Sequence, residues 1–453
     1  MKKFKLGTKV LVITLSLLTV VVGSCVEVVP VLETFKVKDN LSALPHTKKF
    51  EADVATEWFT LLTEIIRTKP YFNPQTLRIF SYSGIALYES VVPGMPSHQS
   101  IYKHLTGNTI EFDKKKEYYW PACANAAIAR ISSRIMQDYP APDLTAVEAL
   151  EANLNSNYQS MVSPEQLELS IEFGRYVADI IYEWSKTDGT FNPDGTLKAC
   201  PTYVPVERPG KWVPTPPGFL PVAGACQGSL RTFIPNIVNS ALVPPHPEYS
   251  TDPASDFYQA AKETYEARNN ITDDETRQFN NWRDLNPNYI PLSHTLRIST
   301  NIMIKEKVNL EDAATLYVKL NMAASDAIGA VFYSKFHYFL MRPVTYIRGV
   351  MGYSTWISLP NTPQTPSYPD EVAATASSIA ILEEYFGENY AFVDDVHKTT
   401  HGEWSYSSFD EMLENIVQAR VSGGTIFRFG GEAGVTQGSL VGNAIDKLPF
   451  KKL

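Results

Sequence analysis

Apolar residues recur along most of this chain at spacings of three and four, the period of an amphipathic helix. The first clear stripe lies at residues 52–67 and consists of Val54, Trp58, Leu61, Leu62, Ile65 and Ile66. Similar stripes occur at residues 75–92, 118–138, 143–157, 164–187, 253–268, 273–283, 292–305, 310–340, 369–386 and 408–422. The alternation typical of strands, bounded by hairpin turns, is hard to find. The pattern predicts an all-α protein with ten or more helices.

One long segment interrupts the helical pattern. Residues 188–250 show no helical stripe. Eleven of the 31 prolines of the chain lie between Pro201 and Pro247. A segment of this length inside a compact domain is uncommon unless it has a function or packs on itself, so it is either a stiff lid or wall, or a connector between two helical halves. We see no low-complexity linker elsewhere, and we therefore expect residues 52–453 to form a single helical domain.

The first residues have the features of an export signal. Four lysines precede an apolar run from Val10 to Val22, which is too short to span a bilayer and ends in Gly-Ser-Cys. This ending resembles a bacterial lipobox, in which the cysteine, here Cys25, becomes the lipidated first residue. We expect residues 1–24 to be a lipoprotein signal peptide and 25–51 a flexible tether, with the domain anchored by lipid in the cell envelope. The alternative is an ordinary signal peptide with an incidental cysteine.

Charge and cysteine content narrow the choice of partners and compartment. The chain has a formal net charge of −9, and because residues 1–24 hold four lysines and no acid, the mature chain would carry about −13. Such an acidic protein is a poor candidate for nucleic acid, which rewards basic patches. Cys200 and Cys226 bracket prolines and could form a disulfide in an oxidising compartment, which leaves Cys123 as a buried thiol.

Three cations stand out as candidate binding residues. Lys335 and Arg342 are seven positions apart in K-F-H-Y-F-L-M-R-P, so on one continuous helix both would leave the same face. Pro343 would then end that helix, because it lacks an amide hydrogen. Arg420 lies far along the chain, in A-R-V-S-G-G-T-I. Together the three could form an anion-binding pocket, although two cations on a solvated helix face have the same spacing.

The order of these motifs resembles the vanadium-dependent haloperoxidases and the phosphatidic acid phosphatase type 2 enzymes. It is Lys-x6-Arg-Pro, then Pro-Ser-Tyr-Pro at 366–369, then Arg-x3-Gly-Gly from Arg420. Further stretches are similar to the exported bacterial branch: R-I-F-S-Y-S-G-I-A-L-Y-E-S, G-K-W-V-P-T-P-P and A-S-D-A-I at 78–90, 210–217 and 324–328. The resemblance implies a fold of two related helix bundles, with the motif-bearing half at about residues 253–445.

The resemblance also implies a particular site. In this family cations neutralise vanadate or phosphate oxygens, one histidine binds the vanadium or attacks the phosphorus, and a second histidine transfers the proton. Carried over by position, Lys335 and Arg342 match the first cationic motif, and Arg420 matches the third. Vanadate or phosphate is therefore an expectation from resemblance alone. The sequence gives no other reason to expect a cofactor or metal.

Several positions depart from the family pattern. Where relatives have Ser-Gly-His after Pro-Ser-Tyr-Pro, this chain has Asp370, Glu371 and Val372. The third motif has Ala419 in place of serine and Ile426 in place of the ligand histidine. Both catalytic histidines are therefore missing. Among other histidines, His337 is expected to point away from the cations, His397 and His401 lie in a polar segment, and His294 stands where relatives often have Pro-Gly-His-Trp.

These departures leave three hypotheses open. The first is a pseudoenzyme that keeps the scaffold as a binding or accessory protein, with Asp370 and Glu371 neutralising the cations internally. The second is an enzyme with altered, non-redox chemistry, in which Asp370 or Glu371 is the acid–base group and the cations hold a small anionic substrate. The third is residual peroxidase or phosphatase activity with the oxyanion held by cations alone. The oligomeric state is not predicted.

Overall fold

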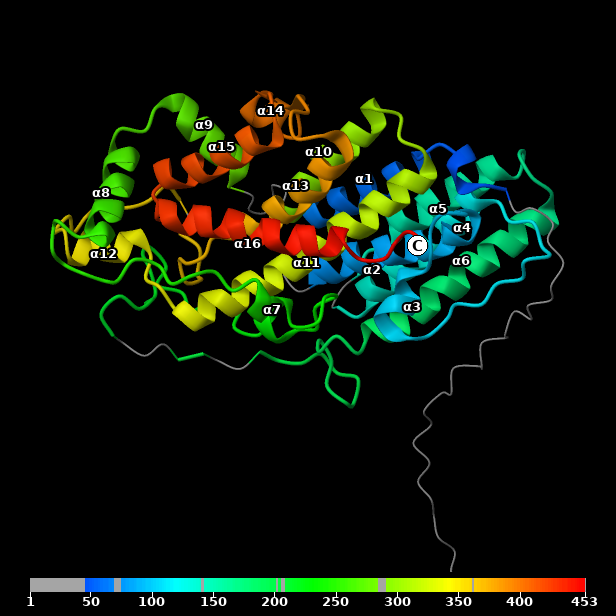
Figure 1. Ribbon diagram of the computed structural model, residues 1–453, viewed down its shortest axis with the longest axis horizontal. Helices are drawn as coiled ribbons and strands as arrows, with labels where there is room; N and C mark the ends of the chain where they lie inside the picture. The colour runs from blue at the N-terminus through cyan, green and yellow to red at the C-terminus, as the bar shows by residue number, and fades with distance from the viewer. Residues whose placement is uncertain are drawn as a thin grey trace, which may run out of the picture. The chain divides into compact units, whose positions relative to one another are not determined.

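The computed structural model describes residues 45–452, except 69–74, 140–141, 201–202, 205–207, 284–290 and 361. The expected signal peptide, Cys25 and most of the expected tether lie outside these residues. Within them the chain forms sixteen α-helices, three short 3₁₀-helices and one two-stranded sheet (Figure 1). The all-α prediction is confirmed. No helix in the described ranges has the length and apolar composition needed to cross a bilayer.

The first half of the described chain forms a helix bundle in which α2 and α6 both pack on α4. Its 3₁₀-helices are η1 (Thr47–Lys49) and η2 (Val92–Gly94). Its α-helices are α1 (Asp53–Thr68), α2 (Gln75–Val91), α3 (Ile101–Thr106), α4 (Trp120–Gln137), α5 (Thr145–Tyr158) and α6 (Pro164–Ser185).

The second half contains the remaining elements. The Pro-rich segment holds η3 (Gln227–Ser229) and α7 (Ile237–Ser240). The helices that follow are α8 (Asp256–Asn269), α9 (Asp273–Trp282), α10 (Pro291–Lys305), α11 (Leu310–Tyr338), α12 (Pro343–Gly349), α13 (Ala373–Phe386), α14 (Lys398–His401), α15 (Phe409–Ser422) and α16 (Arg428–Asp446). Strands β1 (Phe392–Asp394) and β2 (Trp404–Tyr406) form an antiparallel pair in which Val393 lies opposite Ser405.

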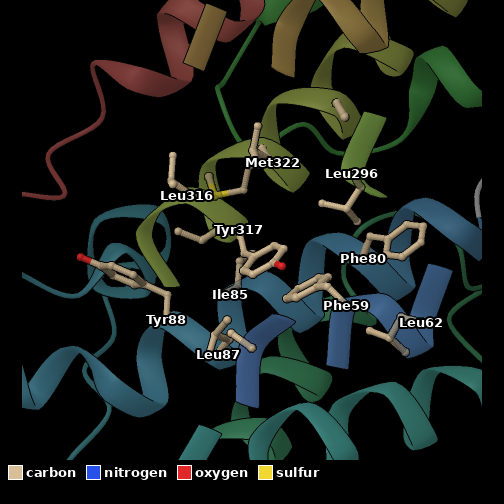
Figure 2. Packing of buried hydrophobic residues seen from close by; sticks show 14 of the residues in the cluster. Phe59, Leu62, Phe80, Ile85, Leu87, Tyr88, Leu296, Leu316, Tyr317 and Met322 are labelled. Carbon is tan, nitrogen blue, oxygen red and sulfur yellow. The ribbon is translucent and has the colours of Figure 1, made fainter. Parts of the chain in front are cut away.

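Helix α11 joins the two halves, because it packs against α2 on one side and against α13 and α16 on the other. Figure 2 shows the core where α1, α2, α10 and α11 meet, with Phe59 and Tyr317 at its centre. Their rings stack with centroids 4.0 Å apart, and both side chains are fully buried. The stripe predicted for α1 faces this core. Aromatic residues of this size contribute most of the buried area that stabilises such a junction.

The described end of the expected tether is not free of the domain. Residues 45–51 pack on the domain: the indole Nε1 of Trp120 donates to the carbonyl oxygen of Pro45 (2.5 Å), and Thr47 is fully buried. The backbone amide of Leu310 donates to the carbonyl oxygen of Phe50 (2.8 Å). The main-chain carbonyl oxygens of this segment accept both bonds, and hydrophobic periodicity does not reveal contacts of that kind.

The Pro-rich segment runs along α11 toward its C-terminal end. A disulfide joins Cys200 and Cys226. The backbone amide of Trp212 donates to Phe339 O (2.9 Å), and that of Ala223 donates to Gln364 O (2.7 Å). The segment therefore borders the residues that follow α11 and those that follow α12. It connects the two halves of the chain and also packs beside the residues that precede Pro-Ser-Tyr-Pro.

Helix α16 was not predicted, because Gly430, Gly431, Gly434, Gly438 and Gly442 obscure its pattern and glycine disfavours helices. The structure explains four of these glycines by their spacing. Gly430, Gly434, Gly438 and Gly442 recur every four residues on one face, which lies against the main chain of residues 367–377. A Cβ on Gly434 would lie 2.5 Å from the carbonyl oxygen of Asp370. The missing side chains thus allow α16 and α13 to lie in close contact.

Candidate functional site

Lys335 and Arg342 do not share a helix, contrary to the prediction. Helix α11 ends at Tyr338, and Phe339 follows in the left-handed conformation (φ 52°). Pro343 does not end this helix but begins α12, where a missing amide hydrogen costs nothing because the first amides of a helix have no partner. Lys335 lies in the last turn of α11, and Arg342 is the N-cap of α12.

The two cations converge instead on one loop. Lys335 Nζ donates to the carbonyl oxygen of Pro366 (2.6 Å), and Arg342 Nε donates to that of Thr365 (2.7 Å). Arg342 also donates from Nη2 to Thr365 Oγ1 (2.8 Å) and from Nη1 to the carbonyl oxygen of Thr425 (3.0 Å). Lys335 is fully buried and Arg342 is 1% exposed. Both cations therefore fix main chain at the start of the second motif, Pro-Ser-Tyr-Pro, and Arg342 also holds the residue that follows the third motif.

Arg420 joins the same cluster from α15. Its Nη1 donates to Asp370 Oδ1 (2.8 Å), and the same oxygen accepts the backbone amide of Val372 (3.0 Å). The Asp370 side chain is 4% exposed and that of Arg420 is 15% exposed. A charge-assisted pair so well shielded from water holds both side chains in place. Asp370 thus faces the cations, as the pseudoenzyme hypothesis requires.

Glu371 forms the second carboxylate contact. Its Oε1 lies 3.6 Å from Lys335 Nζ and accepts a hydrogen bond from Thr365 Oγ1 (3.2 Å). Its side chain is 25% exposed, so it lies at the outer edge of the cluster. We use the name cationic cluster for Lys335, Arg342 and Arg420. Against its three positive charges stand the two carboxylates, which leaves one net positive charge.

Burial and charge act in opposite directions on these groups. Burial lowers the pKa of Lys335 to about 8, and the negative charge of Glu371 opposes part of that shift. Burial also lowers the pKa of Arg342 to about 10, so this side chain stays charged at neutral pH. Burial alone would raise the pKa of Asp370, but Arg420 and Lys335 hold it below its ordinary value. Asp370 is therefore an anion at neutral pH.

The positions where the family has its histidines are apolar and packed. Val372 is fully buried and Ile426 is 1% exposed, and both belong to the main hydrophobic core. A Cβ added at Gly431 would lie 3.2 Å from Cδ1 of Ile426, which shows that this side chain packs against α16. Ala419, in place of the family's serine, is also fully buried. None of these three side chains can supply a nitrogen or oxygen ligand.

His294 pairs with a buried carboxylate. Its Nε2 lies 3.2 Å from Asp394 Oδ2 on β1, which also accepts from Asn281 Nδ2 (2.9 Å). The His294 ring stacks on Trp282 (4.4 Å between centroids), and the ring of His397 lies 4.9 Å from it. His294 therefore belongs to a buried cluster where α9, α10 and the hairpin meet.

The other two histidines considered from the sequence are His401 and His337. His401 is the neighbour of His397, with 5.5 Å between ring centroids, and burial lowers its pKa. His337 is exposed, in keeping with the expected direction of its side chain away from the cations.

Two residues near the cationic cluster were not singled out from the sequence. Thr365 links Arg342 to Glu371 through its hydroxyl, as described above, and a lone threonine in a loop gives no signal. His246 packs edge-on against the ring of Tyr368 in the Pro-Ser-Tyr-Pro segment (5.4 Å), and its Nδ1 donates to Pro247 O (2.7 Å). Burial lowers its pKa. A histidine within P-P-H-P-E-Y could have been noticed, but its sequence distance from the motifs hides the contact.

Two hollows lie elsewhere on the described part of the chain. One has a volume of about 30 Å³, which is room for a single water molecule, and its lining includes Arg78 and Arg231. The other is an open groove of about 430 Å³ along α8, lined in part by Glu263 and Gln418. Lys335, Arg342 and Arg420 line neither.

Vanadate, the group implied by the family resemblance, does not fit the residues present. The two carboxylates already face Lys335 and Arg420, and they would repel a further anion. Val372 and Ile426 put packed hydrocarbon where the family has imidazoles, so neither position offers a nitrogen to vanadium. Within the described ranges there is also no group of three or more His, Cys, Asp or Glu residues placed to hold a metal ion.

Comparison with known proteins supports the family resemblance. The family model of the VCPO second helical-bundle domain matches residues 315–449. The first bacterial vanadium-dependent iodoperoxidase superimposes with a TM-score of 0.79 at 25% identity, covering 88% of this chain and 97% of that one.

The other comparisons add fold similarity. The holo-type bacterial vanadium-dependent chloroperoxidase has a TM-score of 0.62 at 14% identity, covering 84% of this chain and 94% of that one. Its apo-type structure has a TM-score of 0.60 at 14% identity, with 82% and 92% covered. No curated protein matches the chain. From its second helical bundle and its overall fold, this chain belongs to the vanadium haloperoxidase superfamily.

Proposed function

We propose that this protein is a haloperoxidase-fold pseudoenzyme, an exported lipoprotein that acts by binding rather than by vanadate chemistry. The observation that carries the proposal is the pairing of Asp370 with Arg420 at 2.8 Å, together with the approach of Glu371 to Lys335 at 3.6 Å. An oxyanion site needs fixed donors aimed at an incoming charge. Here the donors are aimed at carboxylates and main-chain oxygens of the chain itself.

The loss of the imidazoles supports the same proposal. A proton must be moved by a group that titrates near the working pH, and imidazole is the usual one. Val372 and Ile426 are buried in the core, so a histidine at either position would replace packed hydrocarbon. The chain has therefore exchanged reactive groups for packing at the two places where the family chemistry is carried out.

The test is an assay for vanadate-dependent oxidation of iodide and bromide by hydrogen peroxide. The purified chain is preincubated with orthovanadate, and a vanadium-dependent iodoperoxidase is the positive control. We expect no turnover above that of vanadate alone. Vanadate-dependent turnover that disappears in a Lys335→Met variant would overturn the proposal, because it would show that the cationic cluster still supports the chemistry.

A second candidate function has one observation in its favour. Glu371 is one quarter exposed and adjoins buried Lys335, whose pKa is lowered by burial to about 8. Such a pair could serve as an acid–base group toward a small anionic substrate. If turnover of a candidate phosphate ester or carboxylate is found, Glu371→Gln should abolish it. Residual phosphatase or peroxidase activity is the third outcome, and calorimetry with phosphate and with vanadate tests it.

The proposed location is the bacterial cell envelope, with lipid on Cys25 as the membrane anchor. The support is the sequence of residues 1–25, in which a short apolar run ends in Gly-Ser-Cys. Expression in a bacterial host with labelled fatty acid should yield a labelled protein in the membrane fraction. Cys25→Ala should remove the label and release the chain. A membrane-bound, unlabelled wild type would contradict lipidation.

A further inference from the structure

The donors of the cationic cluster have unequal partners. Arg342 uses Nε, Nη1 and Nη2 on oxygens of Thr365 and Thr425, so its guanidinium is committed to the protein. Lys335 uses one bond on Pro366 O and otherwise faces Glu371. Arg420 uses Nη1 on Asp370, as described above. A carboxylate offers these donors what a phosphate offers: negatively charged oxygens that accept N–H bonds.

The two carboxylates are not held equally. Asp370 is fixed by Arg420 and by the amide of Val372, and its side chain is 4% exposed. Glu371 is 25% exposed, lies 3.6 Å from Lys335 and accepts one longer bond from Thr365. Glu371 is therefore the carboxylate that can turn into solvent without moving the main chain. Its departure would take the nearest carboxylate away from buried Lys335, which is costly unless another anion replaces it.

Two further donors in this region lack partners. The Nε of Arg420 is buried without a hydrogen-bond partner, and so is the hydroxyl of Ser367, which is 1% exposed. Ser367 stands between Pro366, whose carbonyl holds Lys335, and Tyr368. Buried polar atoms are nearly always hydrogen-bonded, so two such atoms on residues of the motif segments need an explanation. Arg420 already donates to Asp370 from Nη1, and an anion with several acceptor oxygens would also accept from its Nε.

We propose that the Glu371 side chain is an internal anion that closes the cationic cluster, and that removing its charge converts the cluster into a receptor for a small tetrahedral oxyanion. The ligand class is inorganic phosphate or orthovanadate, held by Lys335 and Arg420 without catalysis. This inference rests on the proposed function, because it takes the cluster to be occupied by the chain itself. It goes further in naming which residue excludes the ligand.

The test measures phosphate binding to the full chain by isothermal titration calorimetry at fixed ionic strength. Glu371→Ala and Glu371→Gln are compared with wild type and with Glu384→Ala, which removes an exposed charge from α13. We expect both Glu371 variants to bind phosphate at least about tenfold more tightly than the other two proteins, which corresponds to 1.4 kcal/mol. Thermal melts with and without phosphate give a second readout, because a ligand of the folded state raises its stability.

A second substitution locates the bound anion. Adding Lys335→Met to Glu371→Ala should remove the gain in phosphate affinity. Folded Glu371 variants that bind phosphate no better than Glu384→Ala would overturn the inference, as would a wild type that already binds as tightly as the variants. Neither result bears on halide oxidation, which tests the proposed function separately. Circular dichroism identifies any variant that fails to fold. If Glu371→Ala does not fold, the phosphate affinity of Glu371→Gln, which keeps the size of the side chain, tests the inference alone.

Discussion

The glycine stripe of α16 makes a prediction whose sign is opposite to the usual effect of replacing glycine by alanine. A Cβ on Gly438 would lie 2.8 Å from both Cα and the carbonyl carbon of Ala373, and closer still to its carbonyl oxygen. Non-bonded carbons are at their best at about 3.5–4.0 Å. We therefore expect Gly438→Ala to push α16 away from α13. Figure 1 shows the two helices side by side.

Two effects of known size decide the outcome. Alanine inside a helix is favoured over glycine by about 1 kcal/mol, because glycine loses more backbone freedom on folding. Overpacking a closed interface costs about 1–3 kcal/mol. The upper part of that range applies here, since the obstacle is main chain of α13 and cannot rotate aside. The net expectation is a loss of about 2 kcal/mol in the free energy of unfolding.

The measurement is urea unfolding followed by circular dichroism, with Gly349→Ala as the matched control. Gly349 ends α12, is exposed, and has nothing within 4 Å of the position of a Cβ. The control should be unchanged or gain at most about 1 kcal/mol. A Gly438→Ala protein as stable as wild type, beside a control that behaves as expected, would refute the close approach of the two helices.

Three further predictions concern single groups. Arg342→Met should lower the free energy of unfolding by about 3 kcal/mol, because it leaves buried carbonyl oxygens of Thr365 and Thr425 without donors; thermal melts should show a much smaller effect for the half-exposed Arg130→Met. Burial raises the pKa of Glu89 to about 7, so the folded chain keeps a proton that the unfolded chain loses. Stability should therefore fall as pH rises from about 4.5 to 7, by on the order of 3 kcal/mol from this group. Glu89→Gln should flatten that slope in melts at several pH values, and an unchanged slope would contradict the assignment. Cys226→Ser opens a disulfide with a sequence separation of 26 and should cost about 3–4 kcal/mol, seen as a lower melting temperature that reducing agent no longer changes.

The helices that bury one stripe could be predicted from the sequence, and those that follow other rules could not. Helix α1 carries apolar residues on one face and was found within a residue or two of its ends. Helix α16 was missed because its glycines serve contact with α13 rather than helix propensity. The break between α11 and α12 was misplaced for a related reason. Phe339 adopts a left-handed conformation that its residue type does not favour, so tertiary contacts decide where α11 ends.

The sequence indicates which cations belong to the candidate site, but it does not predict how they are arranged. Lys335, Arg342 and Arg420 could be named from motif order, yet their convergence depends on carbonyl oxygens of residues 365 and 366, which carry no side-chain signal. The sequence left open whether Asp370 neutralises the cations or acts as an acid–base group. The hydrogen bond from Arg420 to Asp370 is a feature of the folded chain that motif spacing does not predict. His246 shows the limit of spacing arguments, because it reaches Tyr368 across more than a hundred residues.

The bonds of Lys335 and Arg342 to main-chain oxygens have a consequence for how such chains are recognised. Each cation donates hydrogen bonds to carbonyl oxygens of a loop. Replacing either cation would therefore lower the stability of the fold, whether or not the protein catalyses a reaction. Selection for a folded protein is then enough to preserve the pattern Lys-x6-Arg-Pro. A census of haloperoxidases that counts this pattern alone would include chains without the two histidines, such as this one, whereas the residues at positions 372 and 426 would separate the two groups.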